Sequence, residues 1–134
     1  MEILDRARAL ALLDELPFMR LAGYDQQRQA LYAVPLAFAR AGETLLIAVS
    51  AHGRLAGLLN NQRHGICLEA DEVQPDLSFR SIIGTVAVDR LDDPAQALVA
   101  LAARYAAEWG RWRPAGGLQA YRLHITTIQG RIKR

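Results

Sequence analysis

The sequence predicts a mainly β protein: a small antiparallel barrel of six strands with three flanking helices. Most of the predicted strands are short and are joined by loops of a few residues, which cannot hold the crossover that parallel strands require. The predicted helices are too few to alternate with every strand, as they would in a doubly wound sheet. The chain has 134 residues, the length of one domain, and we expect residues 1–134 to form a single unit.

The predicted elements begin with an amphipathic helix over residues 2–15, which ends before Pro17. Its apolar face is formed by residues at helical spacing: Ile3, Leu4, Ala7, Leu10 and Leu13. Three β-type runs follow over residues 18–24, 30–39 and 43–49, and polar turns separate them. Connections this short predict consecutive antiparallel strands.

The middle of the chain predicts a short helix and two further strands. Leucines recur at intervals of three and four residues after the loop at 50–54, which indicates a helix there. Residues 64–71 and 78–91 have the composition of strands. Within the second of these, Gly84 is a candidate for a bulge or for the close approach of another backbone.

The last part of the chain predicts a helix and a strand. The helix starts at Asp92-Asp93-Pro94, an acidic cap with proline in the first turn, and Gly110 ends it. Its apolar stripe is Leu98, Leu101, Ala102, Tyr105 and Trp109. A loop over residues 111–117 then leads to the final strand, at 119–127.

Composition and charge are those of an ordinary globular protein. Hydrophobic residues make up 51% of the chain, charged residues make up 22%, and the net charge is only +2, which does not demand a nucleic-acid partner. No apolar stretch approaches the ~20 residues of a membrane span. Glu2 and Asp5 stand where a signal peptide carries basic residues. We therefore expect a cytoplasmic protein that binds neither a membrane nor nucleic acid.

Several classes of enzyme lack their usual motifs. The three histidines, His52, His64 and His124, lie far apart in the sequence, so no metal site is predicted. The chain has no Gly-x-Ser-x-Gly elbow, no Walker loop and no dinucleotide glycine fingerprint after a first strand. The hydrolase, kinase and Rossmann dehydrogenase classes therefore lose their usual support, and no catalytic residue can be assigned.

The segment Ser50-Ala51-His52-Gly53-Arg54 is the first candidate site. A strand ends here, a glycine permits close approach of the backbone, and a helix begins after the arginine. Backbone N–H groups at a helix start and a guanidinium can bind one phosphate together, and Ser50 or His52 can add a hydrogen bond. The alternative is that Ser50 simply caps the helix.

Three further segments could contribute to a binding site. Arg80-Ser81 could complete a phosphate pocket if its strand neighbours the first segment, or Arg80 could simply face solvent. Val34-Pro35-Leu36 places a proline in a strand-like run, which fits either a flat ring lying against the main chain or a protected edge strand. Trp112 could lie beside a cofactor or a subunit interface, whereas Trp109 continues the apolar helical stripe and is predicted to be core.

Taken in order, these motifs resemble the pyridoxamine 5′-phosphate oxidase-like FMN-binding proteins, particularly the branch of nitroimidazole-resistance-type proteins. The resemblance covers roughly residues 16–95. It rests on Val34-Pro35-Leu36, Ser50-Ala51-His52-Gly53-Arg54, Leu58-Leu59-Asn60-Asn61, Ile66-Cys67-Leu68-Glu69-Ala70-Asp71 and Phe79-Arg80-Ser81-Ile82-Ile83-Gly84. The ordered set is more specific than any of its members.

The resemblance implies a six-stranded split barrel that forms a homodimer, with FMN in a cleft between the subunits. It implies that the flavin phosphate binds at Gly53-Arg54, in the loop after the third strand, and at Arg80-Ser81; the local residues add Ser50 and His52 as candidates. The flavin ring would lie against Val34, Pro35 and Leu36. In the family the loop before the final strand contributes from the partner subunit, which makes Trp112 a candidate contact.

Two positions depart from the family pattern. Leu55 stands where a lysine commonly follows Gly-Arg, which removes one cation from the phosphate site. Phe79 stands where a tryptophan is usual, and it keeps an aromatic side chain at that position. The first departure predicts weaker binding of FMN.

The leading hypothesis is an FMN-dependent oxidoreductase that acts on a small organic acceptor, with the chemistry supplied by the flavin. The alternative is a non-catalytic binding or sensing module for a flavin, a deazaflavin or haem, and Leu55 favours it. A third hypothesis is a structural dimer without a ligand. Synthesis of pyridoxal phosphate is not favoured, because no extra basic motif for a substrate phosphate stands near the C-terminus.

Overall fold

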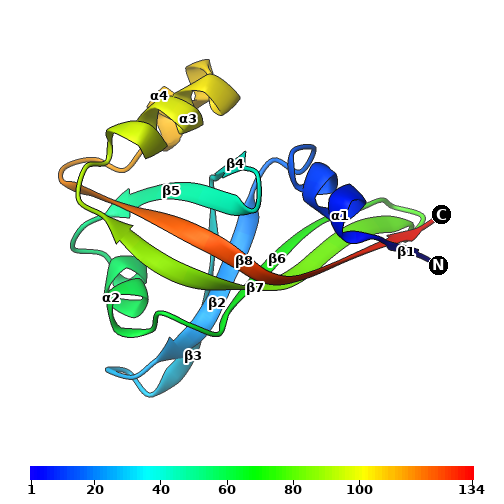
Figure 1. The fold of residues 1–134 in the computed structure, drawn as a ribbon, viewed down its shortest axis with the longest axis horizontal. Helices are drawn as coiled ribbons and strands as arrows, with labels where there is room; N and C mark the ends of the chain where they lie inside the picture. Colours follow the sequence, from blue (N-terminus) through cyan, green and yellow to red (C-terminus); the bar gives the residue numbers. More distant parts are fainter.

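The computed structural model describes all 134 residues as one curled sheet with helices around it (Figure 1). The elements in chain order are β1 (Glu2–Leu4), α1 (Arg6–Leu13), β2 (Met19–Asp25), β3 (Ala30–Leu36), β4 (Ala39–Ala41), β5 (Thr44–Ser50), α2 (Arg54–Asn61), β6 (Ile66–Val73), β7 (Phe79–Leu91), α3 (Ala95–Tyr105), α4 (Ala107–Trp112) and β8 (Leu118–Lys133). None of the helices is long and apolar enough to cross a membrane.

The eight strands follow the order β3-β2-β6-β7-β8-β5-β4, with β1 paired to the end of β8. Every pairing is antiparallel. The outermost strands β3 and β4 do not pair with each other, so the barrel stays split. This architecture confirms the predicted fold class. The six predicted strands correspond to the six longer ones, and the three-residue strands β1 and β4 are additional.

The first predicted helix is wrong at its start. Residues 2–4 form β1 instead, because Leu4 pairs with Gly130 near the end of the long strand β8. Asp5 then begins α1 as its N-cap, and its carboxylate accepts a hydrogen bond from the Arg8 N–H at 2.8 Å. The predicted apolar residues Ile3 and Leu4 thus belong to a strand.

The third predicted helix is also wrong in its second half. The chain breaks at Ala106, whose φ of 50° lies in the left-handed region, and α4 begins after it as a fourth helix. The break directs α4 so that Trp109 is buried against Leu101 and Ala48, which confirms Trp109 as a core residue. Gly110 lies inside α4 and does not end a helix.

Two strand boundaries differ from the prediction for physical reasons. The run at 30–39 divides into β3 and β4, because the N–H of Phe38 donates to the Tyr105 hydroxyl at 3.1 Å and not to a strand. The final strand extends to Lys133, because the basic tail pairs with the start of β7 on one side and with β1 on the other.

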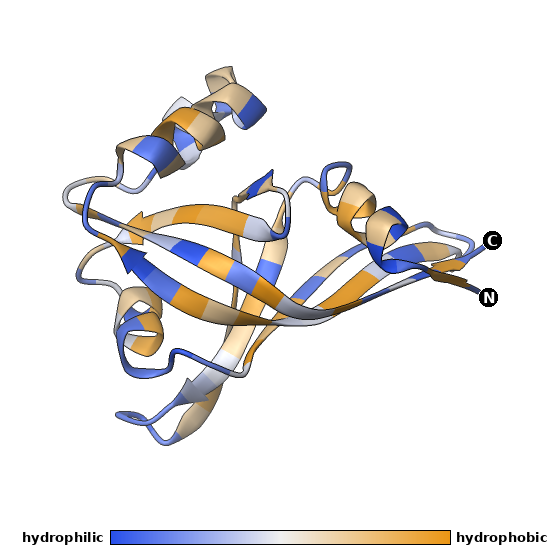
Figure 2. Ribbon diagram, viewed as in Figure 1, coloured by the Kyte–Doolittle hydropathy of each residue, from blue (hydrophilic) through white to orange (hydrophobic).

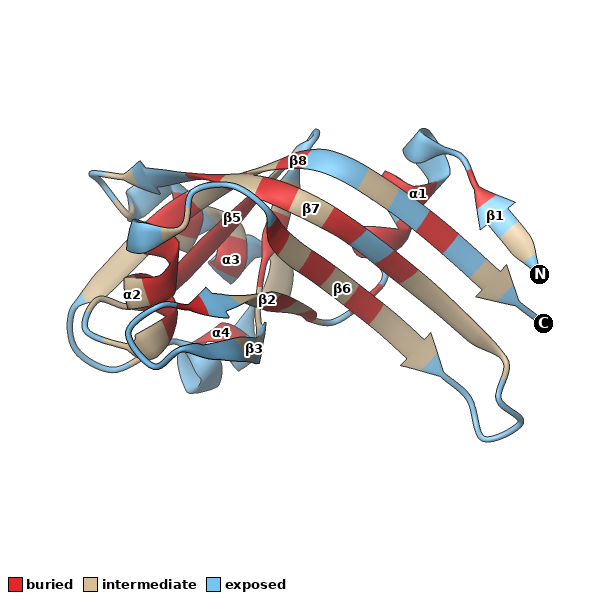
Figure 3. Ribbon diagram, turned by 90° about the horizontal axis from the view of Figure 1, so that it is seen from below, coloured by how far each residue is buried: buried red, intermediate tan, exposed pale blue.

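The core lies inside the curled sheet, as a cluster of 25 buried hydrophobic residues. Figure 3 shows buried residues alternating along β6 and β7, and Figure 2 shows that polar residues gather in the turns. Gly84 lies where β7 and β8 approach closely: a Cβ there would stand 2.4 Å from the backbone oxygen of Thr127. The register shifts only after Thr85, before Val86, so the close approach at Gly84 is confirmed whereas the bulge lies beside it.

Candidate functional site

An apolar cavity of about 500 Å³ opens where the barrel is split. Nine of its 11 lining residues are hydrophobic. The full lining is Phe18, Val34, Pro35, Leu36, Ala37, Ala48, Val49, Leu55, Trp109, Trp112 and Pro114. They come from β3, β5, the start of α2 and the α4 region. A volume of this size suits a small organic ligand, since such pockets hold ~300–1,000 Å³.

The β3 side of the apolar cavity contains three predicted site residues. Val34 and Leu36 pair with Leu21 and Met19 of β2, and both pack against the core. Pro35 lies on an outermost strand of the sheet, the kind of strand in which a residue without an N–H is tolerated. The structure therefore confirms an edge strand at Pro35 and also gives this strand an apolar cavity to line.

The opposite wall of the apolar cavity is formed by α4. Trp109 is buried, whereas Trp112 is 51% exposed and lies 6.0 Å from the ring of Tyr105, measured between ring centroids. Tyr105 is held by its hydroxyl, which donates to the Pro17 carbonyl at 2.8 Å. Trp112 is thus a large aromatic side chain at the rim of the apolar cavity, and about half of its surface faces solvent.

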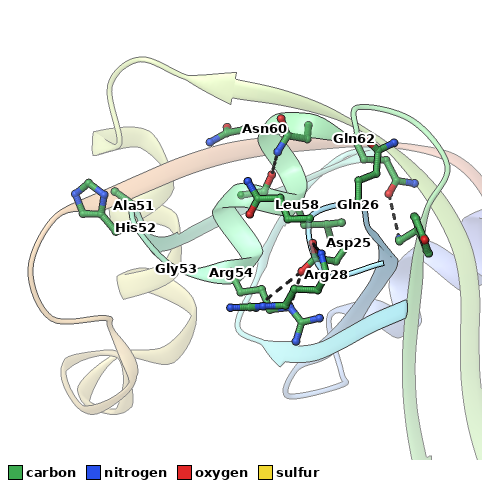
Figure 4. A pocket seen from close by; sticks show the side chains of 14 residues that line it. Asp25, Gln26, Arg28, Ala51, His52, Gly53, Arg54, Leu58, Asn60 and Gln62 are labelled. Carbon is green, nitrogen blue, oxygen red and sulfur yellow. Dashed lines mark hydrogen bonds and ion pairs between the residues drawn. The ribbon is translucent and has the colours of Figure 1, made fainter. Parts of the chain in front are cut away.

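A polar cavity of about 290 Å³ lies along α2 (Figure 4). Its lining is Tyr24, Asp25, Gln26, Gln27, Arg28, Ala51, His52, Gly53, Arg54, Gly57, Leu58, Asn60, Asn61 and Gln62. These residues come from the turn after β2 and from the segment that begins after β5 and ends with α2. Three of the predicted site residues, His52, Gly53 and Arg54, are among them.

Arg54 is held in place by two contacts from neighbouring strands. Its Nε donates to Asp25 Oδ2 at 2.7 Å, and its guanidinium lies 4.1 Å from the centroid of the Tyr32 ring. The same carboxylate accepts a hydrogen bond from the backbone N–H of Arg28 at 3.2 Å. The hydrogen bond from Arg54 is the largest cause that lowers the pKa of Asp25 below its ordinary value of 3.8. Asp25 is therefore a carboxylate that orients Arg54.

Asp25 and Arg28 were not predicted as site residues, because residues 25–29 have the composition of a turn. A signal for Asp25 is nevertheless present in the sequence. The inward positions of β2 are every second residue, Met19, Leu21 and Gly23, and Asp25 continues this series at the end of the strand. A carboxylate at an inward position needs a cationic partner, and Arg54 provides it.

The start of α2 separates the two cavities. Arg54 lines the polar cavity and the next residue, Leu55, lines the apolar cavity. Gly53 is the N-cap, and no side chain caps the helix, so N–H groups of its first turn lack a protein acceptor. Leu55 is buried, so the position that commonly carries a lysine in the resembling family here contributes to the apolar cavity.

Ser50 and His52 have different surroundings. The Ser50 carbonyl accepts a hydrogen bond from the Gly53 N–H at 3.1 Å, and the Ser50 side chain gives α2 no cap. Ser50 lines neither cavity. His52 is exposed at the edge of the polar cavity, away from Arg54 (Figure 4). The N-cap alternative for Ser50 is therefore wrong, and its part in a phosphate site stays a prediction.

Arg80 and Ser81 lie at the other end of the sheet from α2 (Figure 1). β7 and β5 are not neighbours, because β8 lies between them. Arg80 donates to Glu72 at 2.7 Å and to Glu15 at 3.3 Å. One chain therefore does not bring this pair to Arg54, and a shared phosphate site would need a second subunit.

The comparisons with known proteins give one family. A family model described as pyridoxamine 5′-phosphate oxidase matches residues 5–132 of this chain. That match includes both cavities and every predicted site residue. A comparison with curated protein sequences finds no match.

Solved structures share the fold at low sequence identity. An FAD-binding protein from Mesorhizobium loti has a TM-score of 0.79 and 18% identity, over 99% of this chain and 98% of that chain. A candidate 5-nitroimidazole antibiotic resistance protein from Bacteroides thetaiotaomicron has a TM-score of 0.74 and 13% identity, over 96% and 86%. A haem storage protein from Vibrio cholerae has a TM-score of 0.73 and 12% identity, over 92% of each chain. At these identities the likeness establishes the fold alone.

Proposed function

Because the chain belongs to the pyridoxamine 5′-phosphate oxidase family, we propose that it binds the FMN moiety of a flavin cofactor and acts as an oxidoreductase on a small organic acceptor. The observation that carries the proposal is that the neighbouring residues Arg54 and Leu55, at the start of α2, line the polar and the apolar cavity respectively. FMN has the same division, since an apolar ring system is joined through a short chain to a phosphate. The ring belongs in the apolar cavity and the phosphate at the start of α2.

The residues present fit a flavin in both parts. Val34, Leu36 and Val49 offer aliphatic surface to a flat ring, and the edge strand β3 offers main-chain groups to its polar rim. At the other end, uncapped N–H groups and the Arg54 guanidinium favour an anion. Asp25 holds Arg54 through Nε alone, which leaves the terminal nitrogens of the guanidinium for a phosphate.

Haem fits the apolar cavity less well. Iron in haem proteins is held by histidine, cysteine, methionine or tyrosine side chains. None of these residue types lines the apolar cavity, and His52 lies at the edge of the polar one. The donor set therefore favours a flavin over haem at this site.

The bound flavin would supply hydride or electron transfer, and the protein would supply binding, orientation and exclusion of water. The apolar walls keep water from one face of the ring, and Trp112 at the rim can cover part of the opening. No acid, base or nucleophile of this chain lines the apolar cavity. The acceptor is thus expected to be a molecule that reacts by contact with the flavin ring, without a protein proton donor.

We place the proposed site in a homodimer, as the family resemblance implies. If Arg80 and Ser81 contribute to the phosphate site, they must do so from a second subunit, because β8 separates their strand from β5 within one chain. Trp112 leaves about half of its surface exposed at the rim of the apolar cavity. A second copy would cover that rim.

Substitution of Arg54 tests this placement. Arg54→Gln keeps a donor for Asp25 and removes the charge that meets the phosphate, so we expect FMN affinity to fall by about 10- to 100-fold, since a charge-assisted hydrogen bond contributes ~1.5–3 kcal/mol. Isothermal titration calorimetry with FMN measures the change. Arg40→Gln is the matched control, because Arg40 is ion-paired with Asp14 at 2.6 Å and lines neither cavity. Equal affinity of the Arg54→Gln variant and the wild type would reject the placement.

A further inference from the structure

The polar cavity continues well beyond the place where the phosphate of FMN would bind. Its lining includes Gly53 and Arg54 at the start of α2 and Asn60, Asn61 and Gln62 at its end. Seven residue steps separate Arg54 from Asn61, which corresponds to about 10 Å along a helix axis. A single phosphate would occupy only the first turn, so most of the polar cavity has no role in binding FMN.

Gly57 leaves an open surface in the middle of this cavity. Arg54, Gly57 and Asn61 lie three and four residues apart and so share one face of α2. A Cβ added to Gly57 would meet no atom within 4 Å, so no packing contact requires a glycine there. Glycine inside a helix costs about 1 kcal/mol relative to alanine. A flat ring that lies against the bare helix backbone would explain why this position has no side chain.

The walls around Gly57 carry side chains suited to a nucleobase. Five carboxamides line the polar cavity: Gln26, Gln27, Asn60, Asn61 and Gln62. A carboxamide donates and accepts side by side, and in this way it can pair with the amino group and ring nitrogen at the edge of adenine.

Two of these carboxamides, on α2, each have one amide group that makes no hydrogen bond within the protein. Asn60 Oδ1 accepts from the Tyr121 hydroxyl at 2.9 Å, and Asn61 Nδ2 donates to the Gly57 carbonyl at 2.9 Å. The amide nitrogen of Asn60 and the amide oxygen of Asn61 have no protein partner. A donor and an acceptor therefore remain at the far end of the polar cavity.

The charges between the two ends suit a pyrophosphate. Arg54 and Arg28 both face Asp25, at 2.7 Å and 3.9 Å, and Figure 4 shows their guanidinium groups side by side. Two arginines and one aspartate leave a net charge of about +1 here. A terminal phosphate carries about −1.5 to −2. A pyrophosphate diester instead spreads its charge over two groups, and each would lie beside one arginine.

From these observations we propose that the flavin is a dinucleotide, FAD, whose adenosine half lies in the polar cavity along α2, against Gly57 and between the carboxamides. The inference rests on the proposed flavin site, because the FMN half of the same molecule occupies the apolar cavity. It assigns Gly57 as a specificity-determining residue that selects FAD over FMN.

Calorimetric titration of the wild-type protein with FAD and with FMN is the first test. We expect FAD to bind at least tenfold more tightly than FMN. Equal or tighter binding of FMN overturns the inference and leaves the proposed flavin site standing. If neither flavin binds, the proposed function fails and the inference fails with it.

The second test fills the space above Gly57. Gly57→Leu places a side chain where the adenosine would lie, and leucine is a better helix former than glycine, so the fold is retained. We expect this variant to lose the preference for FAD while its affinity for FMN stays unchanged. Ala103→Leu is the matched control, because Ala103 is exposed on α3 and lines neither cavity. An equal loss of FAD and FMN affinity in Gly57→Leu, or no loss at all, contradicts the inference.

Discussion

Glu69 lies beside Asp71 on β6, and both carboxylates receive hydrogen bonds from the same nitrogen of Arg20, at 2.9 Å and 3.4 Å. Partial burial is the largest cause that raises the pKa of Glu69 from 4.5 to about 7, and the hydrogen bond with Asp71 adds to it. The residue opposite Glu69 on β7 is the uncharged Ile83. One cation thus serves two acids, and Glu69 takes up a proton near neutral pH.

This arrangement makes stability depend on pH through Glu69. The folded protein holds the proton more tightly than the unfolded chain, so the stabilising contribution is complete below pH 4.5 and is lost as the pH rises through about 7. Glu69→Gln replaces the acid by a neutral amide that cannot ionise. We expect this variant to have a higher melting temperature than the wild type above pH 7, with the difference disappearing toward pH 4.5. A difference in melting temperature that is the same at pH 4.5 and above pH 7 would contradict the raised pKa of Glu69.

Only part of the candidate site could be predicted from single residues. Gly53 and Arg54 were recognisable, because a glycine and an arginine at a strand-to-helix junction have a chemical meaning that needs no distant partner. Asp25 could not be recognised in this way, since its role depends on Arg54, which lies 29 residues further along the chain. The sequence identifies Leu55 only as a missing cation, and the structure adds that its side chain lines the apolar cavity.

At the scale of elements, the pairing of β7 with β8 depends on Gly84. The buried position leaves no room for a Cβ, because the nearest atom, at 2.4 Å, belongs to the backbone of Thr127 and cannot rotate away. Gly84→Ala is expected to lower the free energy of unfolding by about 1–3 kcal/mol, the range for overpacked sites. Gly57→Ala is the control, since a Cβ there meets open space and should stabilise α2 by roughly 1 kcal/mol. Urea unfolding measures the change in the free energy of unfolding of each variant. Destabilisation of both variants would contradict the close approach at Gly84 as the reason for its glycine.

The elements that could be predicted are those whose pattern is local. The alternation of Ile82, Val86 and Val88 indicates the inward face of β7, and all three are buried. The break at Ala106 could not be predicted, because it depends on the contact between Trp109 and Leu101 after the chain has turned. The strand β1 depends likewise on the far end of β8, more than 120 residues away in sequence.

At the scale of the whole molecule, one face of the sheet carries exposed apolar residues. Tyr24 and Leu31 are paired across β2 and β3, and they are 45% and 84% exposed. Ile83 is 56% exposed, and the register of β2, β6 and β7 places it on the same outer face. The ion-paired Arg20 and Glu69 lie beside Ile83 on this face. Large exposed apolar side chains on a sheet face are typical of a surface that meets a partner. This face is our candidate for the homodimer contact.

The double substitution Leu31→Glu with Ile83→Glu tests the dimer. Four charges brought together across a two-fold contact repel one another, so we expect a dimer in the wild type and a monomer in the variant, measured by light scattering after size-exclusion chromatography. Val99→Glu is the control, because Val99 is 70% exposed on α3, away from this face. A monomeric wild type would contradict the homodimer, and a dimeric double variant would place its contact elsewhere.

The central claim is that the apolar and the polar cavity on either side of the start of α2 together hold a flavin. The most direct measurement is the absorption spectrum of the freshly purified protein, followed by chromatographic identification of any released chromophore. We expect the purified protein to show the near-ultraviolet and blue absorption bands of an oxidised flavin. If the flavin is lost during purification, we expect added flavin to bind until one flavin is bound per chain. A colourless protein that binds neither FMN nor FAD, or one that instead carries the Soret band of haem, would contradict it.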